Sequence, residues 1–474
     1  MSIPGSGRPR SMSAFAAVDL GATSGRVMIG RVRDDRIELE PVSRFPNGPV
    51  ERADGLHWDF GALFENVVEG LGEAVRREPG IRSIGIDSWA VDYGLLRDGE
   101  LLAEPFHYRD ARTGRGVDEV HAVVPFEDLY RRNGLQFLPF NTLYQYRVDE
   151  QLPQADAALL IPDLIAFLLT GRQVAERTNA STTGLLDVRT SEWDLELAER
   201  LGIPVGVLPD LVDPGTVIGT LRPELARRIG AELQVVAVGS HDTASAVVAA
   251  PLSSPQSAYI SCGTWGLVGL ELAEPVVTDA ARAANFTNEL GVDGRIRFLH
   301  NVTGLWLLSE TVRAWEAEDG APIDLPSLLA QAADADGETP LFDANEPSLS
   351  APGDMPARIA ALLGPAAPAS RPAFVRSIVE SIAAAFADAV RTASALSGHE
   401  IDSIHLVGGG SLNRLLCQAT ADRSGLPVLA GPVEATALGN VLIQARATQD
   451  PPASLEQLRA IVAASQVPVR YDPR

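Results

Sequence analysis

The chain has 474 residues, of which 46% are hydrophobic, and a formal net charge of −23; all 39 of its basic residues are arginine. This length exceeds a single hydrophobic core, so we expect two domains. The acidic balance argues against a nucleic-acid partner or an anionic membrane surface. P-loop NTPases and protein kinases are excluded, because both place a lysine at their phosphates. Any phosphate site must therefore use backbone amides, hydroxyls, arginine and a metal ion.

Two further features concern the compartment of the protein. The two cysteines, Cys262 and Cys417, are too few for a disulfide framework and fit no metal motif. Residues 1–13 are polar and lack the apolar core of a signal peptide, so we expect a flexible tail there. No apolar run approaches the length of a membrane span. These features predict a cytoplasmic protein with no membrane partner.

The first ordered segment is a predicted β-hairpin. Residues 15–19 form a buried strand that ends at Asp19, residues 20–26 form a glycine-containing turn, and residues 27–32 form a second strand. A Rossmann or P-loop unit would enter a helix after its glycines, and this segment does not.

The rest of the chain alternates predicted strands and helices, which indicates the α/β class. Residues 251–255 are rich in Pro and Ser, and a second hairpin with a Gly-Thr turn is expected after them at residues 259–270. The similarity of the two hairpins suggests that the two halves arose by duplication. Residues 316–373, rich in Pro, Ala and Asp, are expected to form a loop or variable insertion. The other predicted elements are strands at 81–87, 235–238 and 404–407 and helices at 162–170, around 378–390 and up to about 422. We place the two domains at residues 14–250 and 251–474.

The octapeptide from Asp19 to Arg26 is the first candidate site. A tight turn with two glycines lets backbone N–H groups converge on an anion, and the hydroxyls and the guanidinium add donors. A carboxylate at a strand end suits Mg²⁺, which binds one or two carboxylates and several waters. An ordinary hairpin with a solvated aspartate explains the octapeptide equally well.

The second candidate lies in residues 239–246, which follow an apolar strand. Asp242 could act here as a general base toward a substrate hydroxyl. Alternatively, Asp242 or Thr243 could be the N-cap of an alanine-rich helix, and His241 a packed core imidazole. Taken alone, the segment favours the cap.

Two further motifs follow predicted strands. Asp87, Trp89 and Asp92 could form a sugar platform, since aromatic rings cover apolar sugar faces and carboxylates accept hydroxyl protons. A buried tryptophan and turn acids are an equal alternative. The glycines at 408–410 permit close backbone approach to a flat ring or a phosphate, although such turns are common.

The order of these motifs resembles that of the carbohydrate kinases of the FGGY type, from residue 14 to about 445. The strings that carry the resemblance are VDLGATSGR at 18–26, IDSWAVDY at 86–93, FLPFNTLYQ at 137–145, TNASTTG at 178–184, GSHDTASA at 239–246, SCGTW at 261–265, NVTGLW at 301–306 and VGGG at 407–410. The FNTLYQ and HDT strings are typical of the branch that acts on L-rhamnulose.

This resemblance implies two actin-like α/β domains of the ribonuclease H-like fold, shared by sugar kinases, hexokinase and actin, around a hinged cleft. The first domain would hold mainly the sugar and the second mainly the nucleotide. The residues implied in ATP binding are Ala22, Thr23, Ser24, Gly25, Arg26, Thr264, Asn301 and Gly409. The residues implied in sugar binding are Ala90, His241, Asp242 and Thr243, with Asp242 as proton acceptor and Asp19 holding Mg²⁺ through water.

The implied activity is in-line transfer of the γ-phosphoryl group of ATP to the C1 hydroxyl of L-rhamnulose, by a monomer or homodimer whose partners are the ketose and ATP. Sister kinases for L-fuculose, L-xylulose or another polyol remain alternatives, because pocket shape decides such small differences. An actin-like ATPase or an inactive sugar sensor is a further alternative. Two positions depart from the family pattern: Ala90 stands where glycine is common, and Ser309 where relatives carry glutamine, so the glutamine contact is not carried over.

Overall fold

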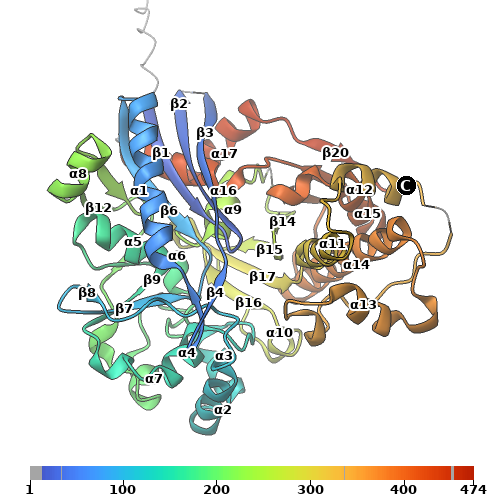
Figure 1. The fold of residues 1–474 in the computed structure, drawn as a ribbon, viewed down its shortest axis with the longest axis horizontal. Coiled ribbons are helices and arrows are strands. Elements are labelled where there is room, and N and C mark those ends of the chain that lie inside the picture. Colours follow the sequence, from blue (N-terminus) through green and yellow to red (C-terminus); the bar gives the residue numbers. More distant parts are fainter. Residues whose placement is uncertain (1–12, 34, 253, 336, 450–452) are drawn as a thin grey trace, which may run out of the picture.

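Two β-sheets with helices packed on their faces form the two halves of the molecule (Figure 1). The computed structural model describes residues 13–33, 35–252, 254–335, 337–449 and 453–474. The tail expected at residues 1–13 lies outside the described residues, except for Ser13, which belongs to the first strand.

The first sheet has the strand order β12-β13-β6-β1-β2-β3. Its strands are β1 Ser13–Leu20, β2 Ser24–Arg33, β3 Arg36–Pro46, β6 Ile81–Ser88, β12 Val217–Thr220 and β13 Gln234–Val236. β1, β2 and β3 form an antiparallel meander, while β6 runs parallel to β1 and β13 runs parallel to β6. The predicted hairpin at the start of the chain is confirmed, and the strand predicted at 235–238 ends two residues earlier.

The second sheet has the order β16-β17-β15-β14-β18-β19-β20. Its strands are β14 Ser257–Cys262, β15 Gly266–Leu272, β16 Thr287–Leu290, β17 Ile296–Val302, β18 Ser403–Val407, β19 Val428–Ala430 and β20 Val469–Tyr471. Here β14, β15 and β17 form the antiparallel meander, and β18 and β19 continue it in parallel with β14. The two sheets therefore repeat one five-strand pattern, as the similarity of the two hairpins suggested.

Helices cover both faces of the first sheet. Alternate side chains of a strand point to opposite faces, so β1 contributes to a hydrophobic core on each side. Ala14, Ala16 and Val18 of β1 belong to the core formed with α1 (Phe60–Arg77) and α5 (Ile161–Thr170). Phe15 and Ala17, one residue out of step, belong to the core formed with α9 (Asp242–Ala249) and α16 (Ala435–Ala447). The sequence predicted α5 and its terminal glycine, which adopts a left-handed conformation.

α9 lies at the centre of the molecule, between the two sheets. Val248 packs in the core of the first sheet, while the neighbouring Val247 packs with Tyr259 and Leu267 of the second. α16 also packs on the first sheet, where Gln444 donates to the backbone oxygen of Ala16 at 3.0 Å. α9, which begins with Asp242, is therefore packed between the two halves. A chain boundary at 250/251 stays a prediction, since α16 lies beyond it and contacts the first sheet.

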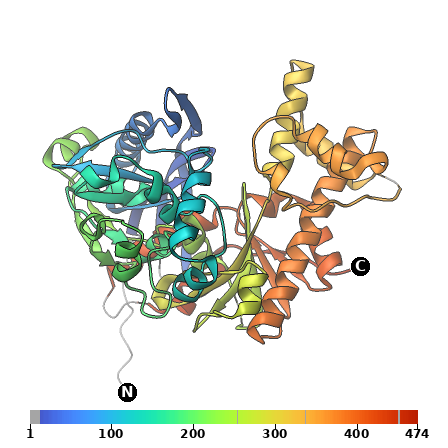
Figure 2. The same ribbon diagram turned by 90° about the horizontal axis from the view of Figure 1, so that it is seen from below.

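The second sheet is covered on its other face by α14 (Arg371–Ser397), which confirms the predicted apolar stripe. The expectation of a loop at 316–373 is wrong. This segment contains the end of α11 (Trp306–Asp319), α12 (Leu325–Ala333), α13 (Met355–Leu363) and the start of α14. Its Asp and Pro residues start helices: Asp324 and Asp354 cap α12 and α13, and a proline follows each within the first turn. Figure 2 shows these yellow and orange helices at the end of the molecule away from the first half.

The remaining elements are shorter or lie at the periphery. They are β4 Pro49–Arg52, β5 Gly55–Trp58, β7 Tyr93–Arg97, β8 Glu100–Leu101, β9 Ala157–Leu160, β10 Ala175–Glu176, β11 Leu211–Val212, α2 Thr113–Val123, α3 Phe126–Asn133, α4 Thr142–Val148, α6 Arg177–Ala180, α7 Leu195–Arg200, α8 Pro223–Ile229, α10 Asp279–Ala283, α15 Arg414–Ser424 and α17 Leu455–Ser465. Within the described ranges, no helix is both long and apolar enough to cross a bilayer.

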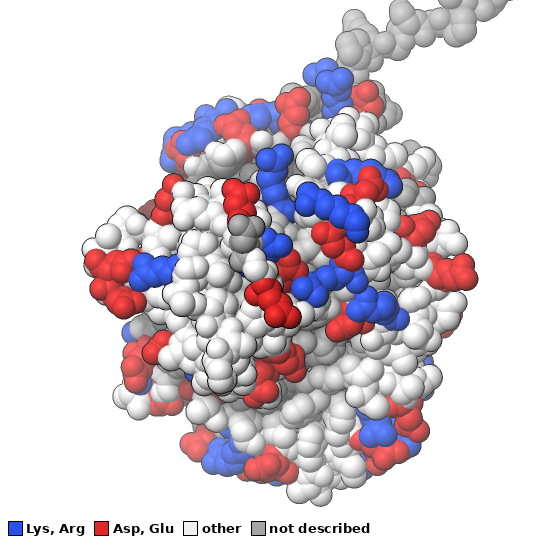
Figure 3. All heavy atoms as spheres, turned by 90° about the vertical axis from the view of Figure 1, so that its right-hand side faces the viewer, with Lys and Arg blue, Asp and Glu red and all other residues white. Residues whose placement is uncertain are grey.

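The surface of the second half carries charges of both signs. Figure 3 shows Arg and Asp or Glu residues interspersed on the face turned to the viewer. Ion pairs join several helices of this half: Arg371 bonds Asp319 at 2.5 Å, and Arg423 bonds Glu380 at 2.7 Å. Over the described residues, this face therefore carries charges of both signs.

Candidate active site between the two halves

A cavity of about 270 Å³ lies between the two halves and is lined by residues of both. All the residues implied by the family resemblance in ATP, sugar or Mg²⁺ binding line it, except Ser24 and Gly25. Ser24 accepts a long hydrogen bond from Arg44, and Gly25 lies so close to Phe45 that a Cβ there would stand 2.2 Å from its ring. These two residues therefore shape the turn without lining the cavity.

The turn between β1 and β2 forms one wall of the cavity. It is closed by a hydrogen bond from the Gly21 amide to the Ser24 oxygen at 2.9 Å. The amides of Ala22 and Thr23, which line the cavity, donate no hydrogen bond to any described residue. Backbone donors left free beside a cavity are suited to an anion such as a phosphate.

Arg26 is bound to two carboxylates. Its guanidinium donates to Asp19 Oδ2 from Nε at 2.9 Å and from Nη2 at 2.7 Å, and it pairs with Glu434 at the start of α16. Burial lowers the pKa of Arg26, but the charges of Asp19 and Glu434 outweigh this and raise it. Arg26 thus links the first hairpin to α16, a contact that the sequence did not predict.

Asp19 is the candidate magnesium ligand, and its surroundings fit that ion. Its side chain is 8% exposed and lines the cavity beside the turn amides. Among the described residues no group of three or more His, Cys, Asp and Glu is arranged as a metal cage. Mg²⁺ is usually bound by one or two carboxylates with waters and substrate phosphates, so a single cleft carboxylate matches its chemistry.

The opposite wall comes from the second half. The turn between β14 and β15 is closed by a hydrogen bond from the Gly263 amide to the Trp265 oxygen at 2.8 Å, and Thr264 lines the cavity at its tip. Next to it, Gly408 adopts φ +85°, and a Cβ on Gly410 would stand 2.3 Å from Cys262 Sγ. Only glycine fits these two positions, and Gly409 between them faces open space.

Asn301 joins the two halves at the side of the cavity. Its backbone amide and its side-chain amide both donate to Gln136 Oε1, each at 3.0 Å. Gln136 belongs to the first half and lines the cavity, but sequence reasoning did not single it out. Gln136 directly precedes the FLPFNTLYQ string at 137–145, and this position could have drawn attention to it.

Asp242 is the first residue of α9 and lines the cavity. The cap interpretation is wrong, because the N-cap position is His241, which makes no side-chain cap bond. Asp242 Oδ1 accepts from Thr243, from its amide at 2.6 Å and its hydroxyl at 3.2 Å. Asp242 Oδ2 has no hydrogen bond among the described residues. Burial raises the pKa of Asp242; the charge of Asp19 adds to this shift, while His241 opposes it. A carboxylate with one free oxygen and a raised pKa is suited to general-base chemistry.

The strand end before Asp242 is fixed by buried hydrogen bonds. Glu176 accepts from the Ser240 amide at 2.9 Å and from its hydroxyl at 2.8 Å. The Ser88 amide at the end of β6 donates to the Ser240 oxygen at 2.9 Å. Glu176 at the end of β10 and Ser88 at the end of β6 therefore fix the segment that leads into α9.

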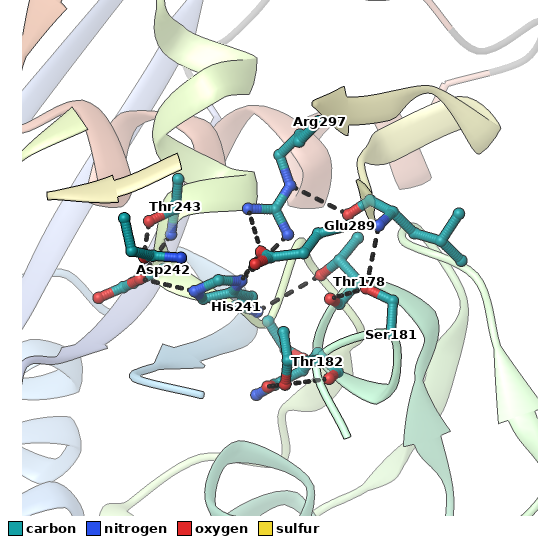
Figure 4. A network of polar contacts seen from close by, with 12 residues as sticks. Thr178, Ser181, Thr182, His241, Asp242, Thr243, Glu289 and Arg297 are labelled. Atoms are coloured by element: carbon teal, nitrogen blue, oxygen red, sulfur yellow. Dashed lines mark hydrogen bonds and ion pairs between the residues drawn. The ribbon is translucent and has the colours of Figure 1, made fainter. Parts of the chain in front are cut away.

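His241 lies in a network of polar contacts behind Asp242 (Figure 4). Its Nε2 is 3.5 Å from Asp242 Oδ1, and its Nδ1 is 3.2 Å from Glu289 Oε2 and 3.0 Å from Arg297 Nη2. Glu289 also lines the cavity. Sequence reasoning missed Glu289 and Arg297, although two charged residues in short buried strands could have drawn attention to them.

The sugar platform predicted at residues 86–94 is only partly realised. Trp89, Ala90 and Val91 line the cavity, but Asp87 and Asp92 are fully buried and do not. Asp92 Oδ2 accepts from the indole N–H groups of Trp58 at 2.7 Å and Trp89 at 3.1 Å. Burial raises the pKa of Asp92 to about 6. The two acids therefore do not face the cavity as the platform prediction required: Asp87 lies within β6, and Asp92 bonds the two indoles.

Val91 shows local backbone strain beside the cavity. Its φ is +69°, a conformation that a β-branched residue rarely adopts. The Val91 oxygen accepts from the Thr142 hydroxyl at 2.8 Å and from Gln145 Nε2 at 3.3 Å, and these bonds hold the strained turn. Both donors belong to the FNTLYQ string, so this string supports the platform from behind.

Comparison with known proteins gives the family. Residues 15–249 match the N-terminal domain of the FGGY family of carbohydrate kinases, and residues 258–448 match its C-terminal domain. The chain is 39% identical to a rhamnulokinase of Bacteroides thetaiotaomicron over 441 residues, which cover 91% of this chain and 90% of the relative. It is 40% identical to a rhamnulokinase of Klebsiella pneumoniae over 476 residues, covering 98% and 95%.

Solved structures agree on the fold. A ligand-bound xylulose kinase of Lactobacillus acidophilus superposes with a TM-score of 0.80 at 19% identity, covering 98% of this chain and 94% of the other. A gluconate kinase of the same organism gives a TM-score of 0.78 at 19% identity with the same coverage. With both family domains matched and near-full-length relatives at about 40% identity, the chain belongs to the FGGY family of carbohydrate kinases and has its two-domain actin-like α/β fold.

Proposed function

We propose that this protein transfers the γ-phosphoryl group of ATP to the C1 hydroxyl of L-rhamnulose and forms L-rhamnulose 1-phosphate. The similarity to rhamnulokinases over nearly the whole chain supports the choice of substrate. The observation that carries the reaction is the position of Asp242, which stands in one cavity with the glycine-containing turns of both halves.

The phosphates of ATP are proposed to bind between the two turns. Ala22 and Thr23 supply free amides from the first half, and Thr264 and Gly409 line the cavity from the second. Because phosphoryl transfer passes through a loose transition state, positioning and electrostatic stabilisation supply most of the acceleration. Backbone donors can serve this purpose in a chain without lysine.

Asp19 is proposed to hold Mg²⁺ through water. When bound, the ion would neutralise charge on the phosphate oxygens as the γ-phosphoryl group is transferred. Asp19 would share its carboxylate with Arg26, which occupies Oδ2 at 2.7 Å and leaves Oδ1 for the hydrated ion. In this proposal the ion would bind beside the first turn.

The sugar is proposed to bind between Ala90 and residues 241–243. Asp242 Oδ2 accepts the proton of the attacking hydroxyl and aims its oxygen at the phosphorus, while His241 and Thr243 flank the carboxylate. Trp89 offers an indole to the apolar face of the sugar. The enclosing halves exclude water, which would otherwise accept the phosphoryl group.

Replacing the base tests this proposal. Asp242→Asn keeps the shape of the side chain but cannot take a proton, and we expect turnover on L-rhamnulose to fall by about 10²- to 10⁴-fold in a coupled ADP-release assay. The fold should be retained, because Oδ1 can still accept from Thr243. Near-normal turnover of this variant would contradict the role of Asp242.

A matched control is Asp59→Asn. Asp59 is the N-cap of α1 and accepts from the Ala62 amide at 3.1 Å, outside the cavity. Asparagine is also a good N-cap, so turnover and stability should stay close to the unaltered protein.

A panel with L-fuculose and L-xylulose, assayed in parallel, decides among sister kinases. ATP hydrolysis that no sugar stimulates would instead indicate an actin-like ATPase.

A further inference from the structure

A buried ion pair in the second half lies directly behind the proposed base. Glu289 of β16 and Arg297 of β17 are cross-strand partners, with Arg297 Nη1 3.2 Å from Glu289 Oε2. The Arg297 side chain is 0% exposed and that of Glu289 is 8% exposed. The free energy of removing two charges from water often exceeds the free energy gained from their mutual attraction. A buried ion pair of this kind therefore indicates a role other than stability.

The pair makes its contacts across the interface between the halves. Arg297 Nε donates to the Leu290 oxygen at 3.0 Å, which fixes the guanidinium in place. From there Nη2 is 3.0 Å from Nδ1 of His241, and Glu289 Oε2 is 3.2 Å from the same nitrogen. Figure 4 shows Glu289 and Arg297 on one side of the imidazole and Asp242 on the other.

The two partners of Nδ1 have opposite hydrogen-bonding abilities. A guanidinium only donates, and an ionised carboxylate only accepts. When Nδ1 carries a lone pair it can accept from Arg297, and when it carries a proton it can donate to Glu289. The ring can therefore keep its orientation both as the neutral tautomer protonated on Nε2 and as the imidazolium, and in both states the Nε2 proton is directed at Asp242 Oδ1.

The charge of Glu289 suits this arrangement. Burial alone would raise the pKa of Glu289, but Arg297 and the hydrogen bond from His241 lower it below its ordinary value. Glu289 is thus ionised at neutral pH and offers an acceptor to the imidazole. His241 belongs to the first half, whereas Glu289 and Arg297 belong to the second.

We propose that Glu289 and Arg297 are positioning residues for phosphoryl transfer, which act through His241 to hold Asp242 in the geometry that receives the hydroxyl proton. Asp242 Oδ1 is held by Thr243 on one side and faces His241 Nε2 on the other, so Oδ2 is left toward the sugar. Without the pair, the imidazole can turn and the carboxylate gains rotational freedom. This inference rests on the proposed role of Asp242 as base.

The primary test is Glu289→Gln, which keeps the size of the side chain and removes its charge. We expect kcat to fall about 10- to 100-fold, by analogy with the loss seen when the partner that orients a metal-bound histidine is removed. KM for ATP should stay within about twofold, because the altered contact is remote from the nucleotide turns. Glu289→Asp keeps the charge at a shorter reach and should recover part of kcat; it also serves if the first variant does not fold.

The matched control is Glu271→Gln. Glu271 forms another buried ion pair of the second half, with Arg459 at 2.9 Å, and neither residue lines the cavity. Loss of that pair should lower the melting temperature and leave kcat unchanged. A parallel fall in kcat for both variants would show that any broken ion pair disturbs the enzyme, and would overturn the inference.

A double-mutant cycle separates the two proposals. In a His241→Ala background, Glu289→Gln should change kcat by less than about twofold, since its effect passes through the missing ring. Independent, multiplicative effects would overturn the inference. Asp242→Asn is measured alongside: if it is inactive while Glu289→Gln is fully active, only the positioning role fails, and if it is active, the base and the positioning role fail together.

Discussion

Gly439 of α16 lies where α16 crosses α9, and its replacement by alanine should disturb both stability and catalysis. A Cβ at this position would stand 1.8 Å from the backbone oxygen of Ser245 and 2.6 Å from its carbonyl carbon. Ordinary contacts begin near 3.4 Å, so α9 would have to retreat by about 1.6 Å. Because backbone atoms make the contact, no rotamer change can relieve it.

The cost of Gly439→Ala follows from two opposing terms. Overpacking of a well-packed core costs about 1–3 kcal/mol, and a rigid backbone contact belongs at the upper end. The better helix propensity of alanine returns up to about 1 kcal/mol. A net loss of about 2 kcal/mol should lower the melting temperature by several degrees. Since α9 begins with Asp242, a displacement of about 1 Å at its start should also reduce kcat by about 10²-fold.

Thermal unfolding followed by circular dichroism and the coupled kinase assay measure the two effects. The control is Gly61→Ala in α1, where an added Cβ meets nothing within 4 Å. That variant should gain up to about 1 kcal/mol and keep its turnover. If Gly439→Ala were as stable and as active as the unaltered protein, the reasoning from the close helix crossing would be refuted.

Two further predictions concern pH and the contact between the halves. Burial raises the pKa of Asp242 above its ordinary 3.8. The value of kcat/KM should therefore fall as the pH is lowered through this raised pKa, because the protonated carboxyl cannot accept the hydroxyl proton. A pH profile of kcat/KM that stays flat down to pH ~4 would contradict a titrating base. The Arg109 guanidinium carbon lies 4.2 Å from the ring centroid of Trp306 in the other half, and Arg109 also donates to the Ser350 oxygen. Arg109→Ala should therefore destabilise the protein by about 1–2 kcal/mol and weaken apparent sugar binding, whereas an unchanged melting temperature and KM would count against this contact.

Local sequence chemistry predicted a large part of the site. The turn after Asp19, the Gly-Thr turn at 264 and the glycines at 408–410 depend on glycine at tight turns, and this requirement is visible in the residues themselves. All three segments line the same cavity. The order of these segments along the chain identified the family before any contact was known.

The sequence-based predictions were wrong at residue types that occur in two different structural settings. Asp and Pro between 316 and 373 suggested a loop, yet Asp324 and Asp354 cap helices and prolines occupy their first turns. Asp242 suggested a cap, yet it is the first helical residue and offers an oxygen to the cavity. A carboxylate next to a helix start can serve either purpose, and only the backbone conformation decides between them.

The sequence by itself determined the α/β class and the two glycine-containing hairpins, and it excluded lysine from any phosphate site. It favoured Asp242 as the base, rather than as a helix cap, only through the family resemblance. Only the tertiary structure decided what surrounds that carboxylate: Glu289 and Arg297 reach His241 from strands that lie about fifty residues further along the chain, and Asp92 is buried beneath the platform it was expected to form. Turn chemistry acts between neighbours in sequence, whereas burial and side-chain pairing depend on which distant strands the folded chain brings together.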